Sequence, residues 1–306
     1  MSNQEISKPL VTVCIVTYNS SEFIVEALDS VFDQSYQNIE LIVSDDCSKD
    51  NTVEVCEKWM ATHAHRFIHA EVVTVEKNTG VSANCNRGVR KGTGVFIKLF
   101  AGDDKLLPCC IEDNVNYMLE HKDADLLFSD MIEFGKGIKD RINSRRVFFE
   151  RLTRKQFKTH LLVRNFLTAP SAFYSRSMYD KMGGFDESIP MMEDKPFYIK
   201  CIFEGCKFAY QSVPTVAYRI GDQSVSQTVK NNRFEDSKRI LFQRVLNRLY
   251  DEDKLFWFYR RNEYYARYDP SMKHNLLRCL RFLNPSYYYT QYIFLKIRLL
   301  LHFNND

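Results

Sequence analysis

Three pairs of neighbouring acidic residues recur along the chain: Asp45-Asp46, Asp103-Asp104 and Glu193-Asp194. The first two pairs each follow an apolar run that is typical of a β-strand, at 39–43 and 95–100. Carboxylates at the carboxyl ends of strands in an open α/β sheet face the crevice where ligands bind. Carboxylates that share a crevice raise one another's pKa unless a cation lies between them. The pattern therefore predicts a divalent metal and, with it, a phosphate-bearing ligand such as a nucleotide diphosphate.

Further polar residues stand at the ends of the predicted strands. The first strand runs into Thr17, Tyr18 and Asn19, although turn statistics make simple capping of the strand end an equally good interpretation. Asp45 can accept hydrogen bonds from a base or from a ribose hydroxyl. A single acid suffices to cap the helix that follows, so its neighbour Asp46 favours a ligand-binding role for the pair.

The run 78–88 opens a short helix and contains Asn78, Gly80, Asn84 and Arg87. Gly80 allows a close approach of the backbone, and the start of a helix can face a phosphate. The alternative is an ordinary capped helix that carries Arg87 on its surface.

The acids after the fourth predicted strand follow a glycine. Gly102 lets the backbone come close to a ligand, and Asp103 can ligate Mg²⁺ or Mn²⁺ while diphosphate oxygens complete the shell. Such a metal neutralises the charge that builds on a departing phosphate.

Strand-like and helix-like patterns alternate between residues 10 and 132. Strands are predicted over 10–16, 39–44, 71–76, 95–100 and 125–131, with helices between them over 24–32, 50–62, 82–90 and 108–121. This alternation predicts an α/β fold with a mostly parallel, doubly wound sheet.

The next part of the chain is less regular. Residues 133–152 are polar and basic, which favours a solvated loop or short hairpin over an acceptor-binding flap. Helices are predicted over 153–163 and 194–204, strands over 169–174, 207–210 and 215–219, and a turn at 183–186.

The sequence pattern changes near residue 230, where mixed strand-like and helix-like segments give way to helix-like segments alone. A domain is therefore predicted over 1–229 and a helical extension over 230–306. Helices are expected over 231–250, 253–267, 271–283 and 286–303. Residues 231–306 hold 14 Lys and Arg against 8 Asp and Glu, which favours an anionic partner. The segment 286–303, with its tyrosines, leucines and two cations, suits a membrane surface. Packing against the catalytic domain or a partner subunit is the alternative.

The bulk composition excludes some classes of protein. A formal net charge of +3 is too small to indicate nucleic-acid binding. Nine cysteines, an odd number with no Cys-x-x-Cys, favour a reducing compartment over a disulfide framework. No secretory signal peptide is apparent. The sequence has no run of about 18 uncharged apolar residues, so no transmembrane helix is predicted.

The ordered set of motifs resembles family-2 glycosyltransferases over about residues 10–226. It consists of Thr17-Tyr18-Asn19, Asp45-Asp46, the 78–88 run, Gly102-Asp103-Asp104, Gly183 to Glu187, and Glu193-Asp194. The resemblance implies a fold of the nucleotide-diphospho-sugar transferase type and inversion at the anomeric carbon. It also implies a cytosolic nucleotide sugar, most often a UDP-sugar, and a saccharide or lipid-linked saccharide acceptor in surface polysaccharide synthesis.

Roles for individual residues follow from the resemblance. It implies that Thr17 and Asp45 hold the uracil and ribose end, that Asp104 contacts ribose, and that Asp103 binds metal and diphosphate. Asp194 aligns with the general base, and Glu193 precedes it as in the family. An inverting transfer needs one base to take the proton of the acceptor hydroxyl.

Several positions depart from the family pattern. Ala101 stands where another Asp is common, Cys47 takes a usual glycine position, and Gly221 replaces a frequent histidine. Arg219, two residues before Gly221, either neutralises the diphosphate or is a surface arginine.

Three other functions fit the motifs less well. A nucleotidyltransferase would need a glycine-rich, cationic loop after the first strand, which 17–21 lacks, and a non-catalytic nucleotide-sugar-binding protein would not need the acids to be kept. A dinucleotide-binding dehydrogenase is disfavoured because no Gly-x-Gly-x-x-Gly follows that strand.

Overall fold

The computed structural model describes residues 8–163, 165–189, 191–221, 232–252 and 260–261. The chain divides into two compact units. The first comprises Met1–Phe157 and Phe166–Val229, and the second comprises Lys158–Asn165 and Lys230–Asp306.

Four parallel strands form the first half of the sheet in the first unit. They are β1 (Val11–Thr17), β2 (Ile39–Asp45), β3 (His69–Val73) and β4 (Phe96–Ala101), in the order β3-β2-β1-β4. Strands β1 and β2 are buried along nearly their whole length. This burial explains why both strands are near-continuous apolar runs, as expected for a parallel sheet with both faces covered.

The second half of the sheet is mixed. Strand β8 (Phe173–Ser175) lies antiparallel between β4 and β6 (Leu126–Phe134). Strand β9 (Phe208–Arg219) runs parallel to β6 and pairs with the short β5 (Lys105–Leu106), and β7 (Arg141–Asn143) pairs with β6 as a hairpin. The predicted α/β fold of the nucleotide-diphospho-sugar transferase type is confirmed, with the parallel order concentrated in β1 to β4.

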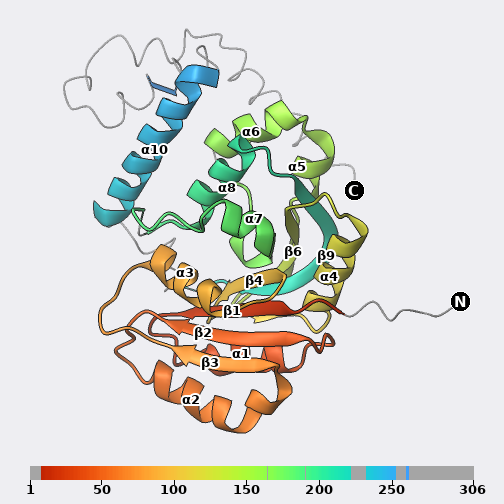
Figure 1. Ribbon diagram of the computed structural model, residues 1–306, viewed down its shortest axis with the longest axis vertical. Helices are drawn as coiled ribbons and strands as arrows, with labels where there is room; N and C mark the ends of the chain where they lie inside the picture. The colour runs from red at the N-terminus through yellow and green to blue at the C-terminus, as the bar shows by residue number, and fades with distance from the viewer. Residues whose placement is uncertain (1–7, 164, 190, 222–231, 253–259, 262–306) are drawn as a thin grey trace, which may run out of the picture. The chain divides into compact units, whose positions relative to one another are not determined.

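Helices cover both faces of the parallel half (Figure 1). Helices α1 (Ile24–Phe32) and α2 (Thr52–His63) lie on one face, and α3 (Val81–Lys91) lies on the other against β1 and β2. Helix α1 buries Ile24, Ala27, Leu28 and Val31, the apolar stripe that the helical spacing predicts.

Further helical segments follow along the chain. They are η1 (Ala64–Arg66), α4 (Cys110–Glu120), α5 (Arg146–Arg151), α6 (Arg154–Val163), η2 (Ala169–Ser171), α7 (Arg176–Lys181) and α8 (Asp194–Phe203). Helix α8 begins at Asp194, where the sequence predicts a helix start.

The structure differs from the predicted elements in several places. The segment 169–174, predicted as a strand, begins with the 3₁₀ helix η2, and strand β8 covers only 173–175. Helix α7 and the short strand β5 were not predicted. Strand β3 begins two residues before the predicted 71–76 segment and ends earlier. The two short strands predicted over 207–210 and 215–219 are one strand, β9, whose register against β6 shifts around Ser129 and Asp130. The polar segment 133–152 forms the predicted short hairpin and, in addition, the unpredicted helix α5.

The second unit contains α10 (Asn232–Glu252), which agrees with the helix predicted over 231–250. Its buried side chains include Leu241, Val245, Leu246 and Leu249. The helices predicted over 271–283 and 286–303, and nearly all of the one over 253–267, lie outside the described residues. Within the described ranges, no helix has the length and apolarity needed to cross a bilayer.

Candidate functional site

Thr17 and Asp45 end two neighbouring parallel strands in register, so their side chains meet at the carboxyl edge of the sheet. The Thr17 hydroxyl donates to Asp45 Oδ1 over 2.9 Å, and the Ser48 amide donates to Asp45 Oδ2 over 2.8 Å. The Ser48 hydroxyl also donates to Asp45. Thr17 and Asp45 are both buried, and these hydrogen bonds fix the orientation of the carboxylate.

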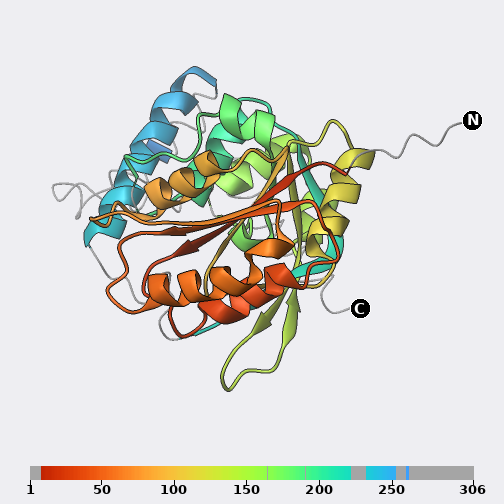
Figure 2. The same cartoon turned by 60° about the horizontal axis from the view of Figure 1, so that its bottom comes forward.

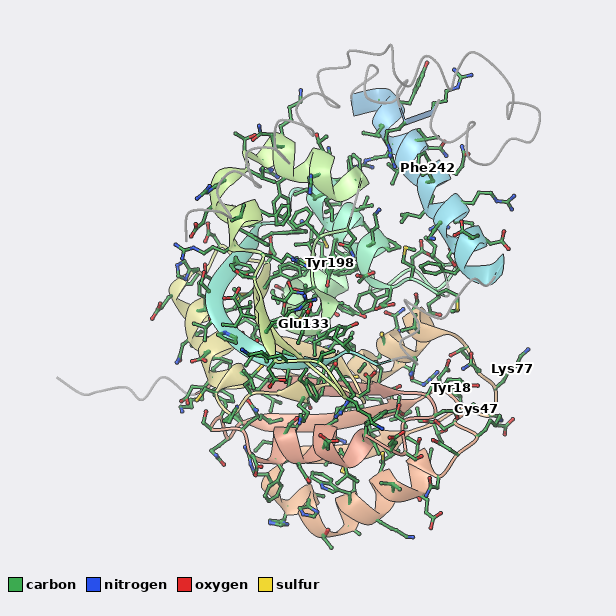
Figure 3. The ribbon with its side chains drawn as sticks, turned by 180° about the vertical axis from the view of Figure 1, so that it is seen from behind. Tyr18, Cys47, Lys77, Glu133, Tyr198 and Phe242 are labelled. Atoms are coloured by element: carbon green, nitrogen blue, oxygen red, sulfur yellow. The ribbon has the colours of Figure 1, made fainter. Side chains whose placement is uncertain are left out.

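Tyr18 and Asn19 form the turn after β1. The Asn19 amide donates to Ser48 Oγ over 2.8 Å, and the Lys49 amide donates back to Asn19 Oδ1 over 2.7 Å. These bonds hold Asn19 at a φ of 53°, a left-handed conformation that asparagine tolerates. The Tyr18 side chain is 49 % exposed and lies beside Cys47 at this edge (Figure 3). Tyr18 therefore presents its ring at the edge, whereas Asn19 joins the two loops.

Cys47 itself has a φ of 67°. This is the left-handed region that favours glycine, which accounts for the glycine that the family pattern places there. The Lys49 ammonium lies 3.0 Å from Cys47 Sγ.

Asp46 is held by the chain segment that leads into α3. Its carboxylate accepts hydrogen bonds from the amides of Thr79 and Gly80, at 3.0 and 2.8 Å, and pairs with Arg87 at 3.2 Å. Asn78 Nδ2 donates to the Asp46 carbonyl over 3.1 Å. Gly80 has a φ of 94°, which requires glycine at this turn. Asp46 therefore fixes the start of α3, a role that a pair of adjacent acids in the sequence does not reveal.

Asn84 and Arg87 anchor α3 to the same strand ends. Asn84 Nδ2 donates to the Thr17 carbonyl over 3.2 Å, and Asn84 Oδ1 accepts from Ser44 Oγ over 2.7 Å. Arg87 Nη2 donates to the Asp45 carbonyl over 3.1 Å and to Asn84 Oδ1 over 2.7 Å. Only 17 % of the Arg87 side chain is exposed, so the alternative of a surface arginine is wrong.

The acids after β4 lie next to Thr17. A Cβ placed on Gly102 would come within 2.9 Å of Thr17 Cγ2, so glycine allows the loop that carries Asp103 and Asp104 to approach β1. Asp104 is almost fully buried; one carboxylate oxygen accepts from the Arg219 amide over 2.9 Å. The other oxygen, Oδ2, has no hydrogen-bond partner among the described residues.

Burial raises the pKa of Asp103. Burial also raises the pKa of Asp104 well above its ordinary value, and the neighbouring Asp103 carboxylate adds to that rise. Both shifts have the sign that burial of a carboxylate away from water produces. A partly desolvated carboxylate such as that of Asp103 fits a hard divalent cation, which prefers oxygen ligands. The described residues bring together no group of three or more potential metal ligands, so oxygens of a bound ligand would have to complete the shell.

Arg219, at the end of β9, holds the Asp103-Asp104 loop. Its Nε donates to the Asp103 carbonyl over 2.8 Å, and its guanidinium forms an ion pair with Glu26 at 3.0 Å. The rings of Phe23 and Phe134 lie 4.4 and 4.5 Å from the guanidinium carbon. The sequence did not indicate these partners, since Phe23 directly precedes α1, Glu26 is on the exposed side of that helix and Phe134 ends β6.

Glu193 and Asp194 stand at the start of α8. The Lys195 amide donates to Asp194 Oδ1 over 2.5 Å. Burial and the adjacent Asp194 carboxylate raise the pKa of Glu193 to about 7. Burial raises the pKa of Cys85 on α3, and the charges of Glu193 and Asp194 raise it further. The two carboxylates therefore lie beside α3.

The segment before α8 is joined to α3 by buried hydrogen bonds. Ser82 Oγ donates to the Ile189 carbonyl over 2.9 Å, and Asn86 Oδ1 accepts from the Phe185 amide over 2.9 Å. Gly184 has a φ of 74°, and a Cβ there would lie 2.7 Å from Asn86 Oδ1. Helix α3 thus connects Thr17, Asp45 and Asp46 on one side with the base candidate on the other.

Comparisons with known proteins agree with this architecture. The sequence model described as glycosyl transferase family 2 matches residues 12–183. An uncharacterized glycosyltransferase of Methanocaldococcus jannaschii is 29 % identical over 219 residues, which cover 71 % of this chain and 72 % of that protein. The putative teichuronic acid biosynthesis glycosyltransferase TuaG of Bacillus subtilis is 32 % identical over 117 residues, 38 % of this chain and 45 % of TuaG.

Solved structures share the fold. Residues 1–349 of S. aureus TarS, in complex with UDP-GlcNAc, align with a TM-score of 0.65 at 20 % identity, covering 86 % of this chain and 74 % of that one. The mannosyltransferase PcManGT of Pyrobaculum calidifontis, in complex with GDP-Man and Mn²⁺, aligns with a TM-score of 0.59 at 17 % identity. That alignment covers 79 % of this chain and 65 % of PcManGT. Because the family model spans more than half of the sequence, this chain belongs to glycosyl transferase family 2.

Proposed function

We propose that this glycosyltransferase moves a sugar, with inversion, from a UDP-sugar to a saccharide or lipid-linked saccharide acceptor. The observation that carries the proposal is the gathering of Thr17, Asp45, Asp103 and Asp104 on one edge of the sheet. Thr17 is in register with Asp45, and it contacts the glycine that precedes Asp103. This edge is where open α/β sheets bind ligands.

In the proposal, Thr17 and Asp45 bind the uracil and ribose end, and the exposed ring of Tyr18 lies against the base. Asp104 would contact the ribose. Its Oδ2 has no hydrogen-bond partner among the described residues but is buried, so it would have to become accessible when the donor binds. A UDP donor is favoured by TarS, which shares the fold and is solved with UDP-GlcNAc.

Most of the other predicted donor-binding residues make hydrogen bonds or ion pairs within the fold. They are Asn19, Asp46, Asn78, Gly80, Asn84 and Arg87. We assign these residues to positioning. They hold the β1 and β2 loops and the first turn of α3, and so keep the groups that touch the donor in place.

Asp103 would hold a divalent Mn²⁺ or Mg²⁺ together with oxygens of the donor diphosphate. When bound, such an ion neutralises the charge that develops on the leaving diphosphate. Arg219 positions Asp103 by donating from its side chain to the Asp103 carbonyl, and it positions Asp104 by donating from its own backbone amide to the Asp104 carboxylate.

The transfer itself is a single displacement. Asp194 removes the proton from the acceptor hydroxyl while the acceptor oxygen forms a bond to the anomeric carbon. The bond between that carbon and the phosphate oxygen breaks, and its electron pair leaves with the nucleotide diphosphate. Glu193, beside Asp194, adds negative charge that strengthens the base when it is ionised.

The expected setting is synthesis of a surface polysaccharide from a cytoplasmic donor, with the enzyme at the inner face of the membrane. The relatedness to TuaG, which is named for teichuronic acid biosynthesis, supports a polymeric saccharide acceptor. The membrane contact predicted for 286–303 lies outside the described residues and stays a prediction.

Replacement of the base tests the proposal. Asp194→Asn should lower kcat by about 10²–10⁴-fold, the range for loss of a general base, while UDP-sugar affinity stays near normal. Turnover is measured as transfer of labelled sugar, and donor binding as the rise in Tm with UDP-sugar and Mn²⁺. Asp180→Asn, an exposed carboxylate on α7, is the matched control and should keep full activity.

Retained turnover in Asp194→Asn would place the base elsewhere. Binding of UDP-sugar without transfer to any saccharide in the wild-type chain would favour a non-catalytic protein. Release of pyrophosphate from a nucleoside triphosphate would favour a nucleotidyltransferase.

A further inference from the structure

We propose that the tip of the β6–β7 hairpin, residues 135–142, docks this enzyme on an anionic lipid surface. The inference rests on the proposed function, because it says where a lipid-linked acceptor would be presented. It uses residues of the first unit and is independent of the tail segment 286–303.

The hairpin tip exposes two apolar side chains. Ile138 is 41 % exposed and Ile142 is 64 % exposed. Ile142 pairs across the ladder with Ile132, which is itself half-buried. Single exposed apolar residues are common on protein surfaces, but here two of them share one projecting turn.

Cations surround these isoleucines. Lys136, Lys139 and Arg141 are exposed, against one acid, Asp140, in the eight residues of the tip. Neither lysine forms an ion pair with any residue that the structure describes. The Arg141 side chain is 75 % exposed although its Nε pairs with the buried Glu133. The tip therefore carries a net positive charge next to exposed apolar groups.

The hairpin leaves the sheet at the catalytic edge. Strands β4 and β6 both run antiparallel to β8, so β6 ends on the same edge as β4 and Asp103. The Ile220 amide donates to the Phe134 carbonyl over 2.7 Å, and a Cβ on Gly135 would lie 2.2 Å from the Ile220 carbonyl oxygen. The base of the hairpin is thus packed next to Arg219, which holds the Asp103 loop.

Figure 2 shows the hairpin projecting beyond the strands and helices around it. Contact of such a projection with a surface would bring the catalytic edge close to that surface. A polyanionic saccharide would be recognised by the cations alone. The two exposed isoleucines instead match a bilayer interface, where apolar side chains enter the headgroup boundary and cations meet anionic lipids.

The test is co-sedimentation of the full chain with vesicles of phosphatidylcholine that contain phosphatidylglycerol. Wild type should bind these vesicles and not pure phosphatidylcholine. The variants are Lys136→Gln with Lys139→Gln, and Ile138→Ser with Ile142→Thr. Each cation near an acidic surface contributes about 1 kcal/mol, so the first double variant should bind about 10–30-fold more weakly. The isoleucine variant should also bind at least about 10-fold more weakly.

Ile68→Thr is the matched control, because Ile68 is 66 % exposed but lies between η1 and β3, away from the hairpin. Its vesicle binding should equal that of wild type. A second readout uses a tryptophan at the tip: fluorescence of Ile138→Trp should be quenched by brominated lipid, whereas quenching of Ile68→Trp should not exceed the wild-type background.

Vesicle binding that is unchanged in both double variants would overturn the inference, as would absence of binding by wild type. A loss of transfer to a polyanionic saccharide with unchanged vesicle binding would also overturn it, in favour of an acceptor-binding hairpin. Transfer of sugar to a soluble acceptor, with UDP release, is measured in parallel. That readout tests the proposed function separately and should stay at the wild-type level in every hairpin variant.

Discussion

Arg219 lies between the rings of Phe23 and Phe134 and donates a hydrogen bond to the Asp103 carbonyl. Only 16 % of its side chain is exposed, and Glu26 pairs with its guanidinium. The alternative of a surface arginine is therefore wrong. These contacts support a positioning role, in which Arg219 aligns the acids after β4.

Arg219→Ala should weaken binding of Mn²⁺ and donor together. A hydrogen bond from a charged donor contributes about 1.5–3 kcal/mol, which predicts a KM for UDP-sugar about 10–100-fold higher. The measurement is a Mn²⁺ titration of activity at several donor concentrations. Lys105→Gln is the control, because the Lys105 ammonium also pairs with Glu26 and lies over Phe134, whereas it is Arg219 that bonds to the Asp103 carbonyl. Equal effects of both variants would contradict a specific role for Arg219.

Under the proposed mechanism, Glu193 should give the site a pH dependence near neutrality. Burial and the Asp194 carboxylate raise its pKa to about 7. As the pH rises through 7, Glu193 loses its proton, and its charge makes Asp194 a stronger base. We expect kcat to rise with pH through about 7 in wild type and this step to be absent in Glu193→Gln.

The same shift links Glu193 to stability. The folded state binds the Glu193 proton more tightly than the unfolded state, so its stabilising contribution is complete below the ordinary pKa of glutamate, about 4.5. That contribution is lost as the pH rises to about 7. Glu193→Gln should therefore gain about 1–3 kcal/mol over wild type between pH 4.5 and pH 8. Urea unfolding at both pH values measures it, and an equal difference at both would contradict the assigned pKa.

At the scale of elements, helix α3 connects the two halves of the site. One side holds Asn84, Arg87 and Gly88 against β1 and β2, and the other holds Ser82 and Asn86 against the segment before α8. A Cβ on Gly88 would lie 2.3 Å from Cys14 Sγ and 2.9 Å from Ser44 Cβ. The close packing of α3 on the sheet depends on this glycine.

Gly88→Ala tests that packing. In an exposed helix, alanine would stabilise by about 1 kcal/mol over glycine. Here the overlap with two buried residues should outweigh that gain and destabilise by about 1–3 kcal/mol, as overpacking does. Urea unfolding gives the stability, and donor affinity should fall with it. Gly221→Ala, where a Cβ would meet nothing within 4 Å, should change stability by less than about 0.5 kcal/mol. A neutral Gly88→Ala would show that α3 can shift without loss of the site.

At the scale of the whole molecule, the tip of the β6–β7 hairpin combines exposed cations with two exposed isoleucines. If the β6–β7 hairpin docks on lipid partly through Lys136 and Lys139, vesicle binding should weaken as salt is added. The Debye length falls from about 10 Å at 0.1 M to about 3 Å at 1 M. The remaining affinity in high salt should depend on Ile138 and Ile142, because apolar burial is not screened.

The order of strands and helices through 10–132, and the strand ends at which the acids stand, could be predicted from the amino-acid sequence. This was possible because buried parallel strands are apolar runs and because α1 repeats its apolar residues with helical spacing. Asp45 and Asp103 were singled out by their place after a strand, whereas the assignment of Asp194 as the base came from the resemblance to family-2 glycosyltransferases and stays a prediction.

Tertiary packing decides which of these polar residues are engaged by hydrogen bonds and ring contacts within the protein. Asp46 bonds to Thr79 and Gly80, and Arg219 meets Phe23 beside α1, contacts between residues far apart in the chain. The joining of 207–210 and 215–219 into β9 also depended on β6 as a partner, since a strand's extent is set by its ladder. Local sequence patterns predict helices and strands because the spacing of apolar residues that favours each of them is a local property. The contact partners and the burial of individual side chains depend instead on how those helices and strands pack.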